Sequence, residues 1–223
     1  MNIEKIPVPK AGEFNSVYRT LRKDIDDICQ PTGPHADGRM HYPDTASLAP
    51  SQRRGLIRAI FAHVEACTYL MRLEILETAA EKLPAHVVMA LRELQIELRP
   101  NGEVSAKALK AKSMSLLRLT FATYSKVVPG LEHPLCAGPG FEALANSVKV
   151  RDRLTHPKVS EDLTVTDSEI LTTIQGFCWF DVAMEKVLRG QLGLFKAKVA
   201  SYKEQIAEMN LLANYSVTRE DPK

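Results

Sequence analysis

Residues 149–158, with the sequence KVRDRLTHPK, combine side chains that can bind a phosphate and react at it. Arg151 can neutralise phosphoryl oxygens and stabilise the negative charge that develops on them in a transition state. His156 can exchange a proton near neutral pH. These two groups can take part in RNA cleavage without a metal ion: the imidazole takes the proton of a ribose 2′-OH, the oxygen attacks the adjacent phosphorus, and the guanidinium stabilises the phosphoryl oxygens. One arginine and one histidine are few for such a site.

The spacing around Arg151 predicts a helix that holds this arginine on its apolar side. Arg151 follows by one more step of three an apolar stripe made of Phe141, Leu144 and Val148. We therefore expect its guanidinium in a partly buried groove, where the buried charge requires a partner anion. The helix should stop near His156, because Pro157 disfavours helical dihedrals in the residue before it, and the helix dipole at that end favours an imidazolium.

Further polar residues of this segment are expected to support the arginine and the histidine. Asp152 precedes His156 by four residues, so its carboxylate should accept a hydrogen bond from the imidazole and fix its tautomer. Thr155 is a second supporting residue. Three cations should bind the backbone of flanking RNA through their charge alone, namely Lys149, Arg153 and Lys158.

The spacing of Arg151 and His156 raises a geometric difficulty. Two side chains five positions apart on an ideal helix diverge by about 140°. They meet at one phosphate only if the helix end unwinds at Pro157 or if a second protomer completes the site across a two-fold axis. We favour the homodimer, since a two-fold interface brings the same helix of both copies together.

The segment Arg151-Asp152-Arg153-Leu154-Thr155-His156 resembles the R-x4-6-H motif of the HEPN-superfamily ribonucleases, in which a polar residue follows the arginine. The resemblance extends over about residues 50–200, and the first 50 residues lie outside it. It implies an all-α and usually homodimeric domain with Arg151 and His156 as the catalytic pair. It also implies metal-independent cleavage of RNA that leaves a 2′,3′-cyclic phosphate, without a cofactor. The setting would be a toxin–antitoxin, phage-defence or RNA-processing system, with an antitoxin or another defence protein as a partner.

Other interpretations of the same residues remain open at this point. Arg151 and Arg153 can be ordinary helix charges and His156 a favourable C-terminal cation, as in a non-catalytic helical dimerisation or nucleotide-binding module. A small-molecule binder is a further alternative. It would require a pocket lined by the second and sixth helices, away from residues 151–156.

The sequence predicts no metal site. The four cysteines are far apart and none belongs to a CxxC pair: Cys29, Cys67, Cys136 and Cys178. His63 and Cys67 are four apart on a helix and are better explained as neighbours in the core than as two ligands without a third. A loop carries His35, Asp37 and His41, for which exposure is the simpler interpretation.

Charge and hydropathy favour a phosphate-bearing partner and exclude a membrane span. The net charge is +2, but residues 103–158 carry nine Lys or Arg against four Asp or Glu. A basic region suits a nucleic acid and is also compatible with a solvated helix face. The start MNIEKIPVPK has no apolar core of a signal peptide, and no apolar run approaches about 18 residues. We therefore expect a cytoplasmic protein.

Apolar spacing predicts a bundle of about five to six helices. The clearest helix follows from Leu56, Ile60, Val64, Cys67, Met71 and Ile75. A helix around residues 18–28 precedes it, and helices over about 88–96, 109–124 and 141–155 follow. A long central helix begins after Thr166, whose T-x-x-E sequence has the form of a capping box, and runs to about Leu212. No segment convincingly predicts a sheet.

These elements suggest three parts of the chain. Residues 1–50 hold an N-terminal helix and a loop rich in proline, residues 51–212 form the HEPN-like bundle, and residues 213–223 form a flexible tail.

Overall fold

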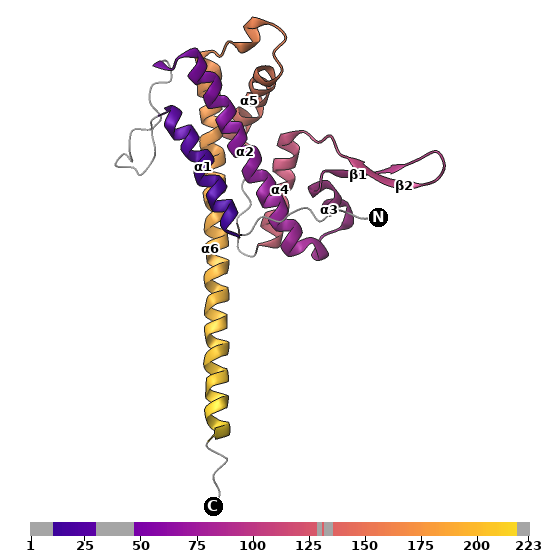
Figure 1. The fold of residues 1–223 in the computed structure, drawn as a ribbon, viewed down its shortest axis with the longest axis vertical. Coiled ribbons are helices and arrows are strands. Elements are labelled where there is room, and N and C mark those ends of the chain that lie inside the picture. Colours follow the sequence, from indigo (N-terminus) through magenta and orange to yellow (C-terminus); the bar gives the residue numbers. More distant parts are fainter. Residues whose placement is uncertain (1–10, 30–46, 129–130, 132–135, 218–223) are drawn as a thin grey trace, which may run out of the picture.

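The computed structural model describes residues 11–29, 47–128, 131 and 136–217. Within these residues the chain forms six α-helices and one β-hairpin (Figure 1). Their bounds are α1 Ala11–Cys29, α2 Pro50–Ala79, α3 Ala85–Leu91, β1 Leu94–Leu98, β2 Val104–Ala108, α4 Ser113–Val127, α5 Pro139–Thr155 and α6 Asp167–Val217. Short 3₁₀ helices cover Ala80–Lys82 and Ser160–Leu163. The prediction of a helix bundle is confirmed.

Helix α2 forms the middle of the bundle and packs against α1, α4, α5 and α6. Its expected apolar stripe is buried along its whole length, from Leu56 to Ile75. Burial of such a stripe against four neighbours removes it from water and orders the helix more effectively than intrinsic propensity does. Helix α1 belongs to the same core, because Ile25 is buried there and the Tyr18 hydroxyl donates to Asp181 of α6 at 3.0 Å.

His63 of α2 is fully buried among aromatic rings of α1 and α6. Its ring centroid lies 4.9 Å from that of Tyr18, 5.7 Å from that of Phe177 and 5.9 Å from that of Phe180. Desolvation lowers its pKa to about 4, and the smaller effect of Asp181 acts in the opposite direction. The imidazole is therefore neutral at physiological pH and packs as a core ring, as the sequence indicated.

The hairpin β1–β2 corrects two sequence predictions. Helix α3 ends at Leu91 instead of continuing through Ile96, and α4 begins at Ser113 instead of near Leu109. Residues 94–98 (LQIEL) alternate apolar and polar side chains, and Gly102 supplies the turn with φ of 80°. The antiparallel register pairs Leu98 with Val104, yet both side chains are exposed. Without a buried face, the strands produce only a weak strand signal in the sequence.

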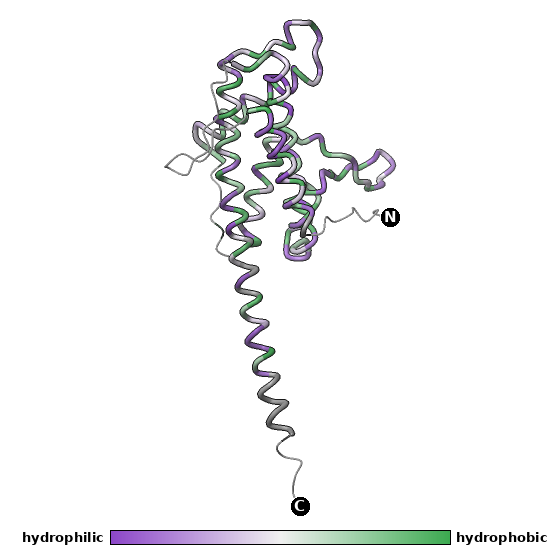
Figure 2. Tube along the Cα trace, turned by 60° about the vertical axis from the view of Figure 1, so that its left-hand side comes forward, coloured by the Kyte–Doolittle hydropathy of each residue, from purple (hydrophilic) through white to green (hydrophobic). Residues whose placement is uncertain are grey.

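Helix α6 is continuous through Gly190 and Gly193 and ends at Val217, five residues beyond the predicted end. The expected capping box is present at its start, where the Thr166 N–H donates to Glu169 Oε2 at 2.9 Å and the Glu169 N–H donates to Thr166 Oγ1 at 3.3 Å. The helix extends well past the other elements (Figure 1), and hydrophobic and hydrophilic residues alternate along the coloured part of that extension (Figure 2). No helix within the described parts of the chain is long and apolar enough to cross a membrane.

Candidate active site at the end of α5

Arg151 lies where α5 crosses α2, as the apolar stripe predicted. Its side chain is 23% exposed, and its Cζ lies 5.4 Å from the centroid of the Phe61 ring. Nη2 is paired with the carboxylate of Glu65, and Nη1 lies 3.1 Å from Asp152 Oδ1. Its Nε–H is buried and has no acceptor in the described structure. The partner anions that burial of a guanidinium requires are thus two carboxylates.

His156 is the first residue after α5, with φ of −126° and ψ of 60°, and its side chain is exposed. The helix ends where Pro157 predicted. The His156 backbone N–H donates to the Asp152 carbonyl at 3.0 Å. Among the described residues no hydrogen bond joins the Asp152 carboxylate to the His156 imidazole, because that carboxylate is paired with Arg151. Asp152 therefore acts on the arginine of this chain, contrary to the expectation that it orients the histidine.

Arg153 holds the loop that follows His156. Its Nε donates to the Asp162 carbonyl at 3.1 Å, and its Nη2 donates to the Thr164 carbonyl at 2.7 Å and lies 3.1 Å from Glu169 Oε1. Two hydrogen bonds to loop carbonyls and one ion pair with a carboxylate leave this guanidinium engaged in the fold. This arrangement does not support the expectation that Arg153 binds RNA.

Arginines of α2 reinforce the same loop. Arg58 Nη2 donates to the Leu154 carbonyl at 3.0 Å, and Arg53 Nη1 donates to the Val165 carbonyl at 3.2 Å. Guanidinium groups near the end of α5 satisfy carbonyls that have no partner within the helix. The backbone on both sides of His156 is therefore fixed, although its side chain is exposed.

Of the other expected site residues, Lys149 shares a groove with Arg151, whereas Thr155 and Lys158 do not line it. Thr155 is exposed, and its hydroxyl donates to the Arg151 carbonyl at 2.8 Å, as helical threonines do. Lys158 is exposed in the loop, where its backbone N–H donates to Asp162 Oδ2 at 2.8 Å. Lys149 is exposed on α5 and lines the same groove as Arg151. The structure thus brings Lys149, Arg151 and Asp152 together and places His156 outside that groove.

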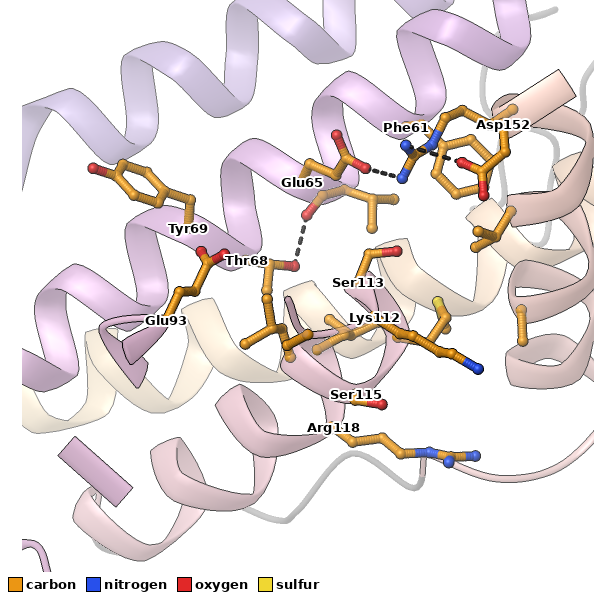
Figure 3. A pocket seen from close by; sticks show the side chains of 18 of the residues that line it. Phe61, Glu65, Thr68, Tyr69, Glu93, Lys112, Ser113, Ser115, Arg118 and Asp152 are labelled. Atoms are coloured by element: carbon orange, nitrogen blue, oxygen red, sulfur yellow. Dashed lines mark hydrogen bonds and ion pairs between the residues drawn. The ribbon is translucent and has the colours of Figure 1, made fainter. Parts of the chain in front are cut away.

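The groove has a volume of about 910 Å³ and lies between α2, α4 and α5. In Figure 3, Glu65 and Thr68 come from the α2 wall, Lys112, Ser113 and Arg118 from the α4 side, and Asp152 from α5. Its size is at the upper end of the range for ligand sites in proteins.

Sequence reasoning missed the two residues that define the environment of Arg151, namely Glu65 and Phe61, and the α4 cations Lys112 and Arg118. The contact of Glu65 with Arg151 spans 86 positions. No local spacing signals such a contact, because it depends on how α2 and α5 cross. Lys112 and Arg118 fell in the basic region 103–158, but charge alone did not separate them from other exposed lysines.

The described residues contain no group of three or more His, Cys, Asp or Glu side chains that could hold a metal ion. His63 Nε2 and Cys67 Sγ are 3.9 Å apart in the core, and burial raises the pKa of the Cys67 thiol to about 12. A thiol with such a high pKa stays protonated at neutral pH, whereas the thiolate is the form that binds a metal ion. The loop residues His35, Asp37 and His41 lie outside the described part of the chain.

Comparison of the chain with family models, with curated proteins and with solved structures gives no match. The geometry of α5 and its surroundings, and the resemblance of residues 151–156 to the HEPN motif, are therefore the indications of function.

Proposed function

We propose that this protein is a metal-independent endoribonuclease of the HEPN type. One observation carries the proposal: a single helix places the Arg151 guanidinium in an open groove and ends at an exposed imidazole, His156. The guanidinium is held over Phe61, and a substrate phosphate binds it by displacing a carboxylate such as that of Glu65. The arginines around residues 154–165 fix the backbone that carries His156. A fixed cation and a fixed proton acceptor are what in-line attack on a phosphodiester requires.

The proposed reaction is an internal transesterification. The imidazole of His156 removes the proton of the ribose 2′-OH, and the 2′-oxygen attacks the adjacent phosphorus. The bond from phosphorus to the 5′-oxygen breaks, and that oxygen receives a proton from an imidazolium. The products are a 2′,3′-cyclic phosphate and a 5′-OH end. Arg151 stabilises the negative charge on the two non-bridging oxygens of phosphorus.

The proposed site is composite and forms in a homodimer. Within one chain, five helical positions separate the two side chains by about 140° around the helix axis. His156 does not line the groove that contains Arg151. A two-fold axis near the end of α5 brings Arg151 and His156 of both copies around one phosphate, so that one imidazole acts as base and the other as acid. Such an enzyme fits a toxin–antitoxin or phage-defence system, in which a partner protein restrains it.

The experiment is cleavage of single-stranded RNA by the purified protein in EDTA. Wild type should cleave and leave cyclic phosphate ends, whereas Arg151→Ala and His156→Ala proteins should lose the activity. Arg99→Ala and His86→Ala are matched controls, because Arg99 and His86 are exposed and do not line the groove. Circular dichroism checks that helicity is unchanged. Equal activity in wild type and the two site variants would identify a contaminant and refute the proposal.

A second candidate is a non-catalytic nucleotide-binding or dimerisation module. The two carboxylates at Arg151 favour it, because a guanidinium already neutralised twice contributes to the fold without any substrate. The two functions differ in His156→Ala protein. A binding module keeps its affinity for nucleic acid without any activity to lose, whereas a ribonuclease keeps its affinity and loses cleavage.

A further inference from the structure

The α4 side of the groove carries positive charge that no carboxylate of the described residues neutralises. Lys112 and Arg118 are exposed, line the groove and have no carboxylate partner among the described residues, and the same holds for Lys149 of α5. By contrast, two cations of the groove are ion-paired, Arg72 with Glu93 at 2.6 Å and Arg151 with Glu65. The three unpaired cations give the groove a net positive field, which attracts an anion.

Arg118 is held in position, unlike an ordinary surface arginine. Its Cζ lies 4.5 Å above the ring of Phe141, which is 1% exposed. Stacking on a buried ring orders the guanidinium before any ligand arrives, so less side-chain entropy is lost on binding. In Figure 3, Arg118 and Lys112 extend from α4 in the same direction, on the side of the groove opposite Glu65.

The groove is elongated, and different side chains line its two ends. Asp152 lies at one end in Figure 3, and Tyr69 and Glu93 lie at the other. Tyr69 is 45% exposed and offers an aromatic ring to a nucleobase. The hydroxyls of Ser113 and Ser115 make no hydrogen bond within the part of the chain that the structure describes, and both line the groove. Spaced cations, free hydroxyls and an exposed ring match a chain of phosphates and bases better than a single phosphate.

We propose that this groove between α2, α4 and α5 binds single-stranded RNA, with Lys112, Arg118 and Lys149 holding phosphates next to the one at Arg151. The inference rests on the proposed function, since it extends the strand from the scissile phosphate along the groove. Walls made of helices on two sides admit unpaired bases and exclude a duplex, whose bases are already paired and stacked. The strand thereby gains contacts that a dinucleotide is too short to make.

The test measures binding of the strand in the groove independently of RNA cleavage. Fluorescence anisotropy measures the affinity of the full-length protein for a labelled 12-nucleotide DNA strand, which lacks the 2′-OH and cannot be cleaved, and for the corresponding duplex. The variant is Lys112→Ala/Arg118→Gln. The matched control is Lys126→Ala, because Lys126 is an exposed cation on the same helix and does not line the groove. Cleavage of an RNA dinucleotide and of an RNA 12-mer by each protein completes the comparison.

We expect the double variant to bind the single strand about tenfold more weakly than wild type, with a salt dependence reduced by about two phosphate contacts. The KM of the double variant for the 12-mer should rise, so that it cleaves the 12-mer more slowly than wild type does. Its cleavage of the dinucleotide should stay as in wild type. Unchanged affinity, equal binding of duplex and single strand, or an equal loss on both substrates would overturn the proposal. Failure of the proposed reaction has a different signature, since wild type would then bind the DNA strand and cleave neither RNA.

Discussion

The carboxylate of Glu65 on α2 is paired with the guanidinium of Arg151 on α5, and both residues line the groove. An incoming phosphate needs the same N–H groups. Glu65 is 47% exposed, and ion pairs with such exposure contribute little to stability, so the carboxylate can swing away at small cost. Glu65 is therefore a competitor of the substrate for Arg151.

Glu65→Gln should strengthen binding of single-stranded nucleic acid. Removal of one negative charge beside Arg151 leaves the guanidinium with Asp152 alone. We expect the Kd for the uncleavable 12-mer to fall by about three- to tenfold, which corresponds to roughly 1 kcal/mol. Glu77→Gln is the matched control, because Glu77 is an exposed glutamate on α2 outside the groove. Weaker binding by Glu65→Gln than by wild type would show that Glu65 positions Arg151 for its ligand.

The sequence predicted the elements that carry a regular apolar stripe. Helix α2 was evident because its apolar residues step by three and four, and α5 was bounded correctly by Pro157. The start of α6 followed from the Thr166 capping box. These features are local, so sequence spacing suffices to find them. The hairpin escaped because Ile96 was assigned to the same helix as Val88 and Leu91, while the two strands share no buried face.

The candidate site was predicted only in part, for the same reason. The motif identified Arg151 and His156, and helical spacing placed Arg151 on the packed side of α5. Asp152 apart, the partners of Arg151 and Arg153 come from other segments, as in the pair with Glu65 of α2 and the bond to the loop carbonyl of Thr164. Contacts of that kind depend on helix crossing and loop path, which single-sequence spacing does not encode. Hence the bonds of Arg153 to the loop were not expected.

Arg153 and Lys149 should respond differently to removal of their charges. Arg153→Ala leaves the carbonyls of Asp162 and Thr164 without a donor, so we expect the free energy of unfolding to fall by about 1.5–3 kcal/mol. Lys149→Ala removes an exposed cation and should change it by less than about 0.5 kcal/mol. Urea denaturation measures both changes.

Nucleic-acid binding should show the reverse order for these two variants. Lys149→Ala should reduce the salt dependence of binding by about one phosphate contact, whereas Arg153→Ala should leave it as in wild type. Anisotropy titrations at several salt concentrations give that slope. A reduced slope in Arg153→Ala protein, with stability unchanged, would assign Arg153 to the RNA interface after all.

His63 should make the fold sensitive to acid. Burial lowers its pKa to about 4, whereas the unfolded chain has the ordinary value of 6.5. Between these values the unfolded state binds a proton that the folded state does not, so this contribution is complete above pH 6.5 and is lost as the pH falls towards 4. The loss amounts to about 1.4 kcal/mol per pH unit in that window.

His63→Leu protein should lose this part of the acid sensitivity. The substitution removes the titrating group and the buried Nδ1 atom, which has no partner in the described structure. Urea denaturation at pH 7.5 and pH 5 should show a smaller drop in the variant than in wild type. His86→Gln is the control, because His86 is exposed and should leave the drop unchanged. An equal drop in wild type and His63→Leu would mean that His63 is protonated in the folded protein.

Gly176 sets the distance between α5 and α6, and its replacement should displace α5, the helix that carries Arg151. A Cβ added at Gly176 would lie 2.5 Å from the backbone N and Cα of Leu144, so Gly176→Ala must push α5 away from α6. Overpacking of this kind costs about 1–3 kcal/mol of stability. Because α5 carries Arg151 and leads into His156, RNA cleavage should fall as well.

Gly193→Ala is the control on the same helix. Its added Cβ meets nothing within 4 Å, and it should stabilise the protein by up to about 1 kcal/mol through helix propensity. Thermal or urea denaturation of the two variants gives opposite signs if the close approach of α5 and α6 is a requirement of the fold. Equal stabilisation by both alanines would mean that α5 can shift freely, and the groove would then lack the fixed wall on which Arg151 depends.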